Sequence, residues 1–148
     1  MSSELGEKLK PQGENVIFLV YDSKTGCVWL EERLKPDSGY FGYTIIPGGK
    51  IESSDKTADY ALIREVHEEM GIKVVTFSPL DIFVEPSLSK GNLMINHAYL
   101  VSNFEGEVYD KEESEGKNRL FAVPLGEAKN HLEIASSRYI IELAKGKL

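Results

Sequence analysis

Residues 64–72 read REVHEEMGI and place three glutamates on one short stretch of expected helix. An α-helix advances about 100° per residue, so Glu68 and Glu69 fall at about −60° and +40° from Glu65. The three carboxylates therefore form one stripe. Beside it, at about 60° to 160°, lies an apolar arc that is expected to face the core and consists of Leu62, Ile63, Val66 and Met70.

An acidic stripe at the edge of a core-facing surface needs a physical reason, because like charges at this spacing repel. A solvated helix face is one reading, but such faces usually lie opposite the apolar arc and include lysines at i,i+4 spacing. A bound divalent cation is the other reading, since Mg²⁺ prefers carboxylate oxygens and keeps waters for substrate phosphates. His67 falls on the far side and is expected to face solvent.

The segment before this helix adds a second signal. A strand is expected over residues 41–46, and it is halted by Pro47, Gly48 and Gly49. Glycine lets the backbone approach a ligand or metal closely, although a tight turn explains a glycine pair equally well. Four residues that favour helix N-caps follow: Ser53, Ser54, Asp55 and Thr57. They predict the start of a helix that ends at Met70, with Gly71 as its C-terminal glycine.

The remaining elements predict a mixed α/β or α+β sandwich, because several strands lie on both sides of one strong helix. Strands are expected at 15–22, 27–34, 72–77, 81–86, 93–104 and 119–125, a loop at 109–117, and two short helical pieces after Gly126.

The composition limits the function classes. The chain has 148 residues, which suits one domain, and 17 Lys and Arg against 24 Asp and Glu give a formal charge of −7. This balance disfavours stable nucleic-acid binding but permits a small polyphosphate if a divalent cation lies between the partners. Cys27 is the single cysteine and is expected to be a buried strand residue. No secretory leader or membrane span is expected, which favours a cytoplasmic protein.

Residues 48–72, GGKIESSDKTADYALIREVHEEMGI, resemble the Nudix box. That pattern is Gly, five residues, Glu, seven residues, then Arg-Glu-aliphatic-x-Glu-Glu-x-Gly-aliphatic. Gly49 matches its first position, and the second half matches without a gap from Arg64 to Ile72. The chain departs from the pattern in the loop, which is one residue longer. The first Glu of the box becomes Asp55 or Lys56, depending on the direction of counting, and Asp55 is the candidate to replace the missing carboxylate.

The resemblance implies a Nudix αβα sandwich and hydrolysis, dependent on Mg²⁺ or Mn²⁺, of a nucleoside diphosphate linked to another group. It assigns Glu65, Glu68 and Glu69 as metal ligands, with the Gly48 carbonyl as an additional one. Glu68, Glu69 or Glu112 would be the general base, Glu112 coming from a downstream acidic loop that also offers Glu113 and Glu115. The alternative for that stretch is a disordered acidic loop. Arg64 is expected to orient a glutamate through a salt bridge.

The substrate is less well indicated by the sequence. Chain length favours a nucleoside triphosphate pyrophosphohydrolase of the MutT-like kind, and an ADP-ribose or nucleotide-sugar diphosphatase is the alternative. Pro86 is similar in position to a proline that ADP-ribose hydrolases of the family often have, although a turn between two strands explains it equally well. Gly49, Tyr40 and Tyr43 are candidate substrate contacts, although both tyrosines also suit a strand or core. A non-catalytic nucleotide-sensing module is the rival class, and an isoprenoid diphosphate isomerase ranks lower because Cys27 is poorly placed for it. A homodimer is left open.

Overall fold

The computed structural model describes residues 10–36, 40–87, 91–109 and 118–148. Its strands are β1 (Glu14–Asp22), β2 (Cys27–Glu32), β3 (Thr44–Ile45), β4 (Gly48–Lys50), β5 (Lys73–Pro86), β6 (Leu93–Glu105) and β7 (Arg119–Pro124). Its helices are α2 (Ala58–Met70), the 3₁₀ helix η1 (Leu125–His131) and α4 (Ala135–Lys145).

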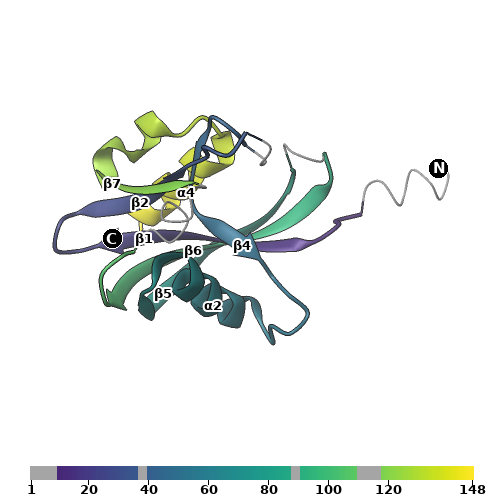
Figure 1. Ribbon diagram of the computed structural model, residues 1–148, viewed down its shortest axis with the longest axis horizontal. Coiled ribbons are helices and arrows are strands. Elements are labelled where there is room, and N and C mark those ends of the chain that lie inside the picture. Colours follow the sequence, from purple (N-terminus) through teal and green to yellow (C-terminus); the bar gives the residue numbers. More distant parts are fainter. Residues whose placement is uncertain (1–9, 37–39, 88–90, 110–117) are drawn as a thin grey trace.

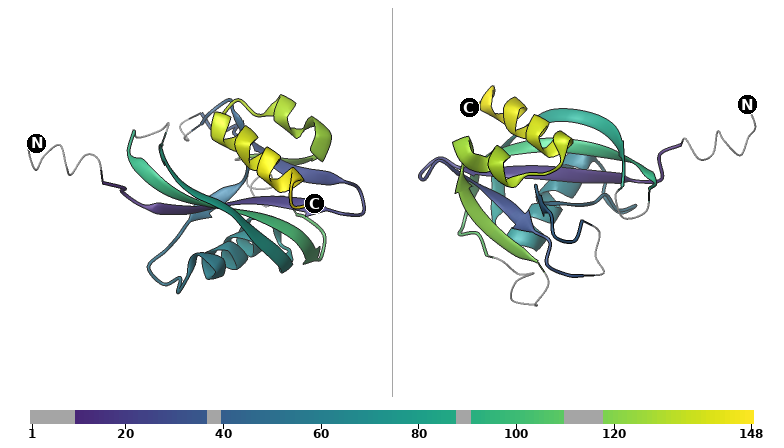
Figure 2. Two further views of the ribbon diagram at one scale, coloured as in Figure 1. Left: turned by 180° about the vertical axis from the view of Figure 1, so that it is seen from behind. Right: turned by 90° about the horizontal axis from the view of Figure 1, so that it is seen from above.

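A mixed sheet forms the middle layer of the molecule. Its main order is β3-β2-β1-β6-β5, with β4 paired to β1 and β7 paired to β2. The β1–β6 pair is parallel and the other pairs are antiparallel. Figures 1 and 2 show α2 on one side of this layer and α4 with η1 on the other. The expected sandwich of a mixed sheet between helices is therefore confirmed.

Alternation along the central strands builds two hydrophobic cores. In β1, Leu19 belongs to the core beneath α4, whereas Phe18 and Val20 belong to the core beneath α2. The same alternation separates Leu100 from Val101 in β6. Successive strand residues point to opposite faces, so a strand that is covered on both sides must be apolar at every position. This double covering explains the continuous apolar runs in the sequence.

Several expectations about strands are wrong. The Gly48–Gly49 pair does not halt a strand but begins β4, where Gly48 pairs with Ile17 and Gly49 with Val16. A Cβ on Gly48 would stand 2.6 Å from the Val16 carbonyl oxygen, so only a residue without a side chain can approach β1 this closely. The strand expected over 41–46 is correspondingly reduced to Thr44–Ile45.

The second error concerns β5, which was expected as two separate segments. The structure forms one 14-residue strand, Lys73–Pro86, whose pairing with β6 contains three register shifts between Val74 and Asp81. Irregularities of this kind absorb Pro79 without breaking the strand. The strand expected over 27–34 is also shorter and ends at Glu32.

Helix α2 itself agrees closely with its expected bounds and faces. Leu62, Val66 and Met70 are fully buried, and His67 is exposed. Ile63 is an exception, because its side chain lies at the margin of the apolar arc and is 43% exposed. Cys27 lies in a strand as expected but is only half-buried. No helix in the described ranges is long and apolar enough to span a membrane.

Candidate active site

Local capping fixes where helix α2 begins and ends. The Thr57 hydroxyl accepts a hydrogen bond from the Tyr60 N–H at 3.1 Å, which satisfies one of the free donors of the first turn. Gly71 has φ 70°, and its N–H donates to the His67 carbonyl, so the helix ends in the left-handed conformation that favours glycine. The three glutamates are thereby held at fixed positions relative to the sheet.

Glu65 is the buried member of the acidic stripe. Only 6% of its surface is exposed, and its carboxyl group packs directly against Gly49 of β4. A Cβ at position 49 would overlap the Cδ and Oε2 atoms of Glu65. Burial raises the pKa of the Glu65 carboxyl, although the adjacent Arg64 guanidinium acts in the opposite direction. The absent side chain of Gly49 therefore makes the space that the Glu65 carboxylate occupies.

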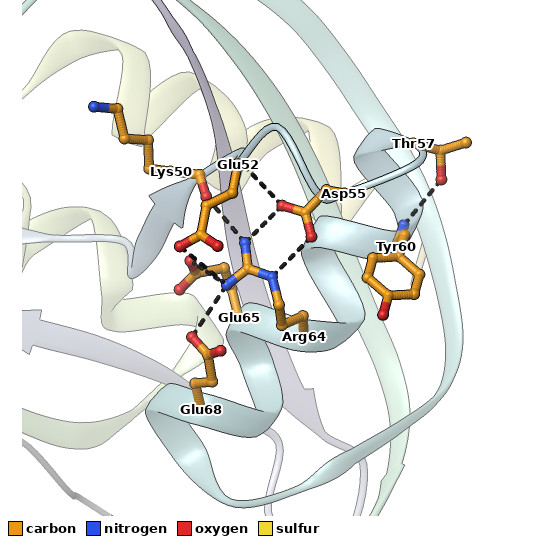
Figure 3. A network of polar contacts seen from close by, with 8 residues as sticks. All are labelled: Lys50, Glu52, Asp55, Thr57, Tyr60, Arg64, Glu65 and Glu68. Carbon is orange, nitrogen blue, oxygen red and sulfur yellow. Dashed lines mark hydrogen bonds and ion pairs between the residues drawn. The ribbon is translucent and has the colours of Figure 1, made fainter.

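Arg64 connects the acidic stripe to the preceding loop. Its Nη1 donates to Glu65 Oε1 at 3.0 Å and to Glu68 Oε2 at 3.1 Å, and its Nη2 donates to the Lys50 carbonyl at 3.1 Å. Figure 3 shows the guanidinium between these carboxylates. A planar guanidinium offers five donors in a rigid fork, so this geometry orients both glutamates and ties them to β4.

Asp55 holds the other side of the same guanidinium. Its two oxygens accept from Arg64 Nε at 2.8 Å and Nη2 at 2.7 Å, and one of them also accepts from the Glu52 N–H at 2.8 Å. The hydrogen bond from Arg64 lowers the pKa of Asp55 to about 2. The Asp55 side chain has no exposed surface. Its oxygens are therefore engaged with Arg64 and the loop backbone, which places the carboxylate of the altered loop beside the arginine.

The residues expected to hold a metal supply an open set of oxygen donors. Glu65 and Glu68 each use one oxygen to accept from the same nitrogen of Arg64, so the guanidinium brings the two carboxylates close together. The Glu68 side chain is 53% exposed, and Glu69 is half-buried. Within the described ranges, no group of three or more His, Cys, Asp or Glu side chains is arranged so that it could hold a metal ion by itself.

This donor set nevertheless fits Mg²⁺. Magnesium is commonly held by one or two carboxylates together with waters and substrate phosphates, and a closed protein cage is not needed. Glu112 lies outside the described residues, as do Glu113 and Glu115.

A cleft of about 310 Å³ borders strand β4, although Glu65, Glu68 and Glu69 are not among its lining residues. Gly48, Gly49 and Lys50 of β4 form part of its wall, and Ser136 and Ser137 near the start of α4 form another part. The strand β4 thus contacts Glu65 and also borders the cleft.

The two candidate tyrosines differ in their positions. Tyr40 lines the cleft and has a positive φ of 64°, whereas Tyr43 is not among the lining residues. Tyr43 instead contacts Tyr40, with ring centroids 6.4 Å apart. The geometry therefore brings Tyr40, but not Tyr43, to the edge of this space.

The cleft contains polar residues that sequence reasoning missed. Glu31 and Asn96 are each 5% exposed, and Asn15, Arg33 and Glu85 also border the space. The two-residue period of the strands could have indicated two of these residues. Asn15 shares its face of β1 with Leu19, and Asn96 shares its face of β6 with Leu100, so both positions are core-facing yet polar.

The comparisons with known proteins agree with this architecture. The NUDIX domain family model matches residues 11–143. A probable nudix hydrolase from Schizosaccharomyces pombe is 30% identical over 123 residues, which are 79% of this chain and 42% of that protein. The chain therefore spans less than half the length of this curated relative.

Solved structures of low sequence identity share the fold. The MutT NUDIX hydrolase from Burkholderia pseudomallei has a TM-score of 0.72 at 21% identity, over 90% of this chain and 98% of that chain. The NUDIX domain of Shewanella oneidensis NrtR, solved with ADP ribose, has a TM-score of 0.65 at 18% identity, over 99% and 98% of the two chains. With the family model matching nearly the whole chain, the helix that carries REVHEEMGI identifies this protein as a member of the Nudix family.

Proposed function

We propose that this single domain hydrolyses, with Mg²⁺ or Mn²⁺, a nucleoside diphosphate linked to another group, and that its principal substrate is a nucleoside triphosphate. The observation that carries the proposal is the placement of the buried Glu65 carboxyl against Gly49, in a strand that also borders the cleft. Glu65 and a space of ligand size thus both lie against β4. This juxtaposition suits a substrate whose phosphates lie at β4 while its nucleoside fills the cleft.

The roles of the residues follow from their positions. Glu65, Glu68 and Glu69 would hold the cation, with the Gly48 carbonyl as a further oxygen donor. A bound Mg²⁺ would offset the charge of the diphosphate and lower the pKa of a coordinated water. Arg64 orients Glu65 and Glu68 through the hydrogen bonds described above, and Asp55 holds Arg64 in place.

Proton removal from the attacking water requires a carboxylate at the site. Glu69 is half-buried on the same helix face, and Glu68 is more exposed, so both are candidates for the general base. Glu112 stays a third candidate from the sequence. Lys50 and Arg33 border the cleft together with Glu31 and Glu85. Arg33 pairs with Glu31 at 3.4 Å, so a phosphate at β4 would find its cation in Lys50.

ADP-ribose or a nucleotide sugar is the second candidate substrate class. It is favoured by the likeness to the Shewanella domain, which was solved with ADP ribose. A non-catalytic nucleotide-sensing role is the third candidate, and it rests on the departure of the Ser54–Lys56 loop from the family pattern. The cytoplasmic location and the absence of stable nucleic-acid binding stay predictions from the sequence, and a homodimer stays an open alternative.

A substrate panel tests the proposal. The purified protein is incubated with MgCl₂ and, in turn, nucleoside triphosphates, ADP-ribose, nucleotide sugars and dinucleoside polyphosphates. Pyrophosphate or phosphate released from the triphosphates is measured directly. The nucleoside monophosphates and other nucleotides formed from ADP-ribose, the nucleotide sugars and the dinucleoside polyphosphates are separated and quantified by chromatography, and samples with excess EDTA serve as the metal-free control. Turnover of triphosphates that stops with EDTA supports the principal assignment. Turnover of ADP-ribose alone favours the second candidate class, and no turnover of any compound would refute the hydrolase assignment.

A further inference from the structure

Three polar side chains form a hydrogen-bonded chain across three adjacent strands of the cleft. Asn15 of β1 and Asn96 of β6 are register partners in the parallel pair. Asn15 Nδ2 donates to Asn96 Oδ1 at 3.2 Å, and Asn96 Nδ2 donates to Glu85 Oε1 of β5 at 3.0 Å. Asn96 is 5% exposed, so its amide is held almost entirely by these two partners. Neither the acidic stripe nor Arg64 contributes to this chain of contacts.

The Glu85 carboxylate, at the end of this series of hydrogen bonds, fixes which group donates and which accepts in each of them. An ionised carboxylate can only accept, so the group that Asn96 turns toward Glu85 must be its NH₂. The Asn96 carbonyl oxygen then faces Asn15, which must in turn present its own NH₂. A single charged residue therefore determines the orientation of both amides.

This orientation leaves hydrogen-bond acceptors available at the cleft. The two hydrogen bonds use Asn15 Nδ2 and one oxygen of Glu85. Among the described residues, none donates a hydrogen bond to Asn15 Oδ1 or to the second oxygen of Glu85. Both residues border the cleft described above and also a second pocket of about 330 Å³. The two spaces share Asn96, Tyr40 and Lys50 as well, so the acceptors stand where the spaces meet.

We propose that Asn15 and Glu85 form an acceptor wall that selects substrates by hydrogen-bond donors on the nucleoside. The matching groups are an exocyclic amino group of the base or a ribose hydroxyl. The proposal rests on the proposed function, since it assumes that the cleft holds a nucleotide. A carboxylate repels phosphate, so the wall also orients the ligand, with its uncharged nucleoside toward Glu85 and its phosphates away from that carboxylate.

The variant Glu85→Gln tests the wall with almost no change of volume. The glutamine oxygen can still accept from Asn96, and its NH₂ then replaces the free carboxylate oxygen at the cleft with a donor. A site that hydrogen-bonds a substrate donor rejects analogues that lack it, because its own buried polar groups are left unpaired. Glu127→Gln is the matched control, since Glu127 is exposed on η1 and borders none of the pockets described here.

Two sets of matched ligands distinguish the two sources of donors. ATP, GTP and CTP are each compared with the analogue that lacks the exocyclic amino group. The same nucleotides and UTP are then compared with their 2′-deoxy forms. In the wild type, kcat/KM for one set should favour the donor-bearing member by about 10- to 100-fold, as expected for a hydrogen bond to a charged group. Glu85→Gln should reduce that ratio to within a few-fold of one, and Glu127→Gln should leave it unchanged.

Binding measurements separate this inference from the proposed hydrolysis. Dissociation constants are measured by calorimetry for the same pairs as non-hydrolysable α,β-methylene triphosphates, with thermal melting to verify the fold of each variant. A wild type that cleaves nothing refutes the hydrolase assignment, yet a binding ratio that collapses in Glu85→Gln still supports the wall. Equal ratios in the wild type and in Glu85→Gln, for both sets of ligands, would overturn the inference.

Discussion

The replacement Gly49→Ala is the sharpest test of how β4 positions Glu65. The Cγ atom of Glu65 would stand 2.7 Å from the new Cβ, whereas ordinary van der Waals contact begins at 3.4 Å. Glu65 must therefore move by about 0.7 Å at Cγ. Its carboxylate must move further, because two of its atoms lie closer still to the added carbon. The movement also strains the 3.0 Å bond between Arg64 and Glu65.

The expected effects on activity and stability differ in size. A misplacement of about 1 Å in a group that organises an active site costs about 100-fold in rate, so kcat/KM should fall by that factor or more. Overpacking of a buried contact costs about 1–3 kcal/mol, which lowers the melting temperature of a domain of this size by about 2–12 °C. The protein should therefore stay folded at 25 °C while it loses most of its activity.

The assay is pyrophosphate release at saturating Mg²⁺, measured beside a thermal melt. Gly126→Ala is the control, because a Cβ there meets no atom within 4 Å. It should leave both quantities unchanged. A double variant, Gly49→Ala with Glu65→Ala, should regain part of the lost stability without regaining activity, because it removes the collision together with the carboxylate. If Gly49→Ala keeps wild-type kcat/KM and melting temperature, Glu65 is not held against β4 in the way described.

Three further variants test other parts of the site. Asp55→Asn should destabilise the protein more at pH 6 than at pH 2.5 in urea unfolding. Arg64 lowers the pKa of Asp55 to about 2 in the folded protein. The stabilising contribution of the ionised Asp55 is therefore present above about pH 4 and is lost as the pH falls toward about 2. Equal losses at both pH values would contradict this ion pair. Glu69→Gln should reduce turnover by orders of magnitude with an unchanged melting curve, and wild-type rates in saturating Mg²⁺ would show that the residue has been misassigned. Tyr99→Phe removes a buried hydroxyl that donates to Asp59 at 2.7 Å, and it should lower the free energy of unfolding by about 1–2 kcal/mol in denaturant titrations. A change below 0.5 kcal/mol would indicate that this bond contributes little.

Helix α2 could be predicted from the sequence because its signals are local. The apolar arc repeats at helical spacing, and residues that favour helix ends, Thr57 and Gly71, flank the segment within one turn. The stripe of Glu65, Glu68 and Glu69 follows from the same spacing, since side chains three and four residues apart share a face whatever the rest of the chain does. The sequence by itself therefore determined the helix, its acidic edge and the family resemblance.

The position of the glycine pair needed the tertiary structure. From the sequence, Gly48 and Gly49 suit a turn as well as a strand, because glycine adopts either conformation. The pairing of β4 with β1 decides between them, and this pairing joins residues about 30 positions apart. From the sequence, Asp55 suits a helix N-cap as well as a replacement for the missing carboxylate of the box. Only the folded loop shows that its carboxylate holds Arg64.

The acceptor wall was decided by the fold alone. Asn15 and Asn96 are 81 positions apart, and Glu85 lies on a third strand, so no local pattern brings the three together. Strand register is set by the packing of both cores at once, and this packing aligns two polar positions that are each isolated in the sequence. The residues that carry the proposed chemistry are thus close in the chain, whereas those that we propose select the substrate meet only because the sheet aligns distant strands.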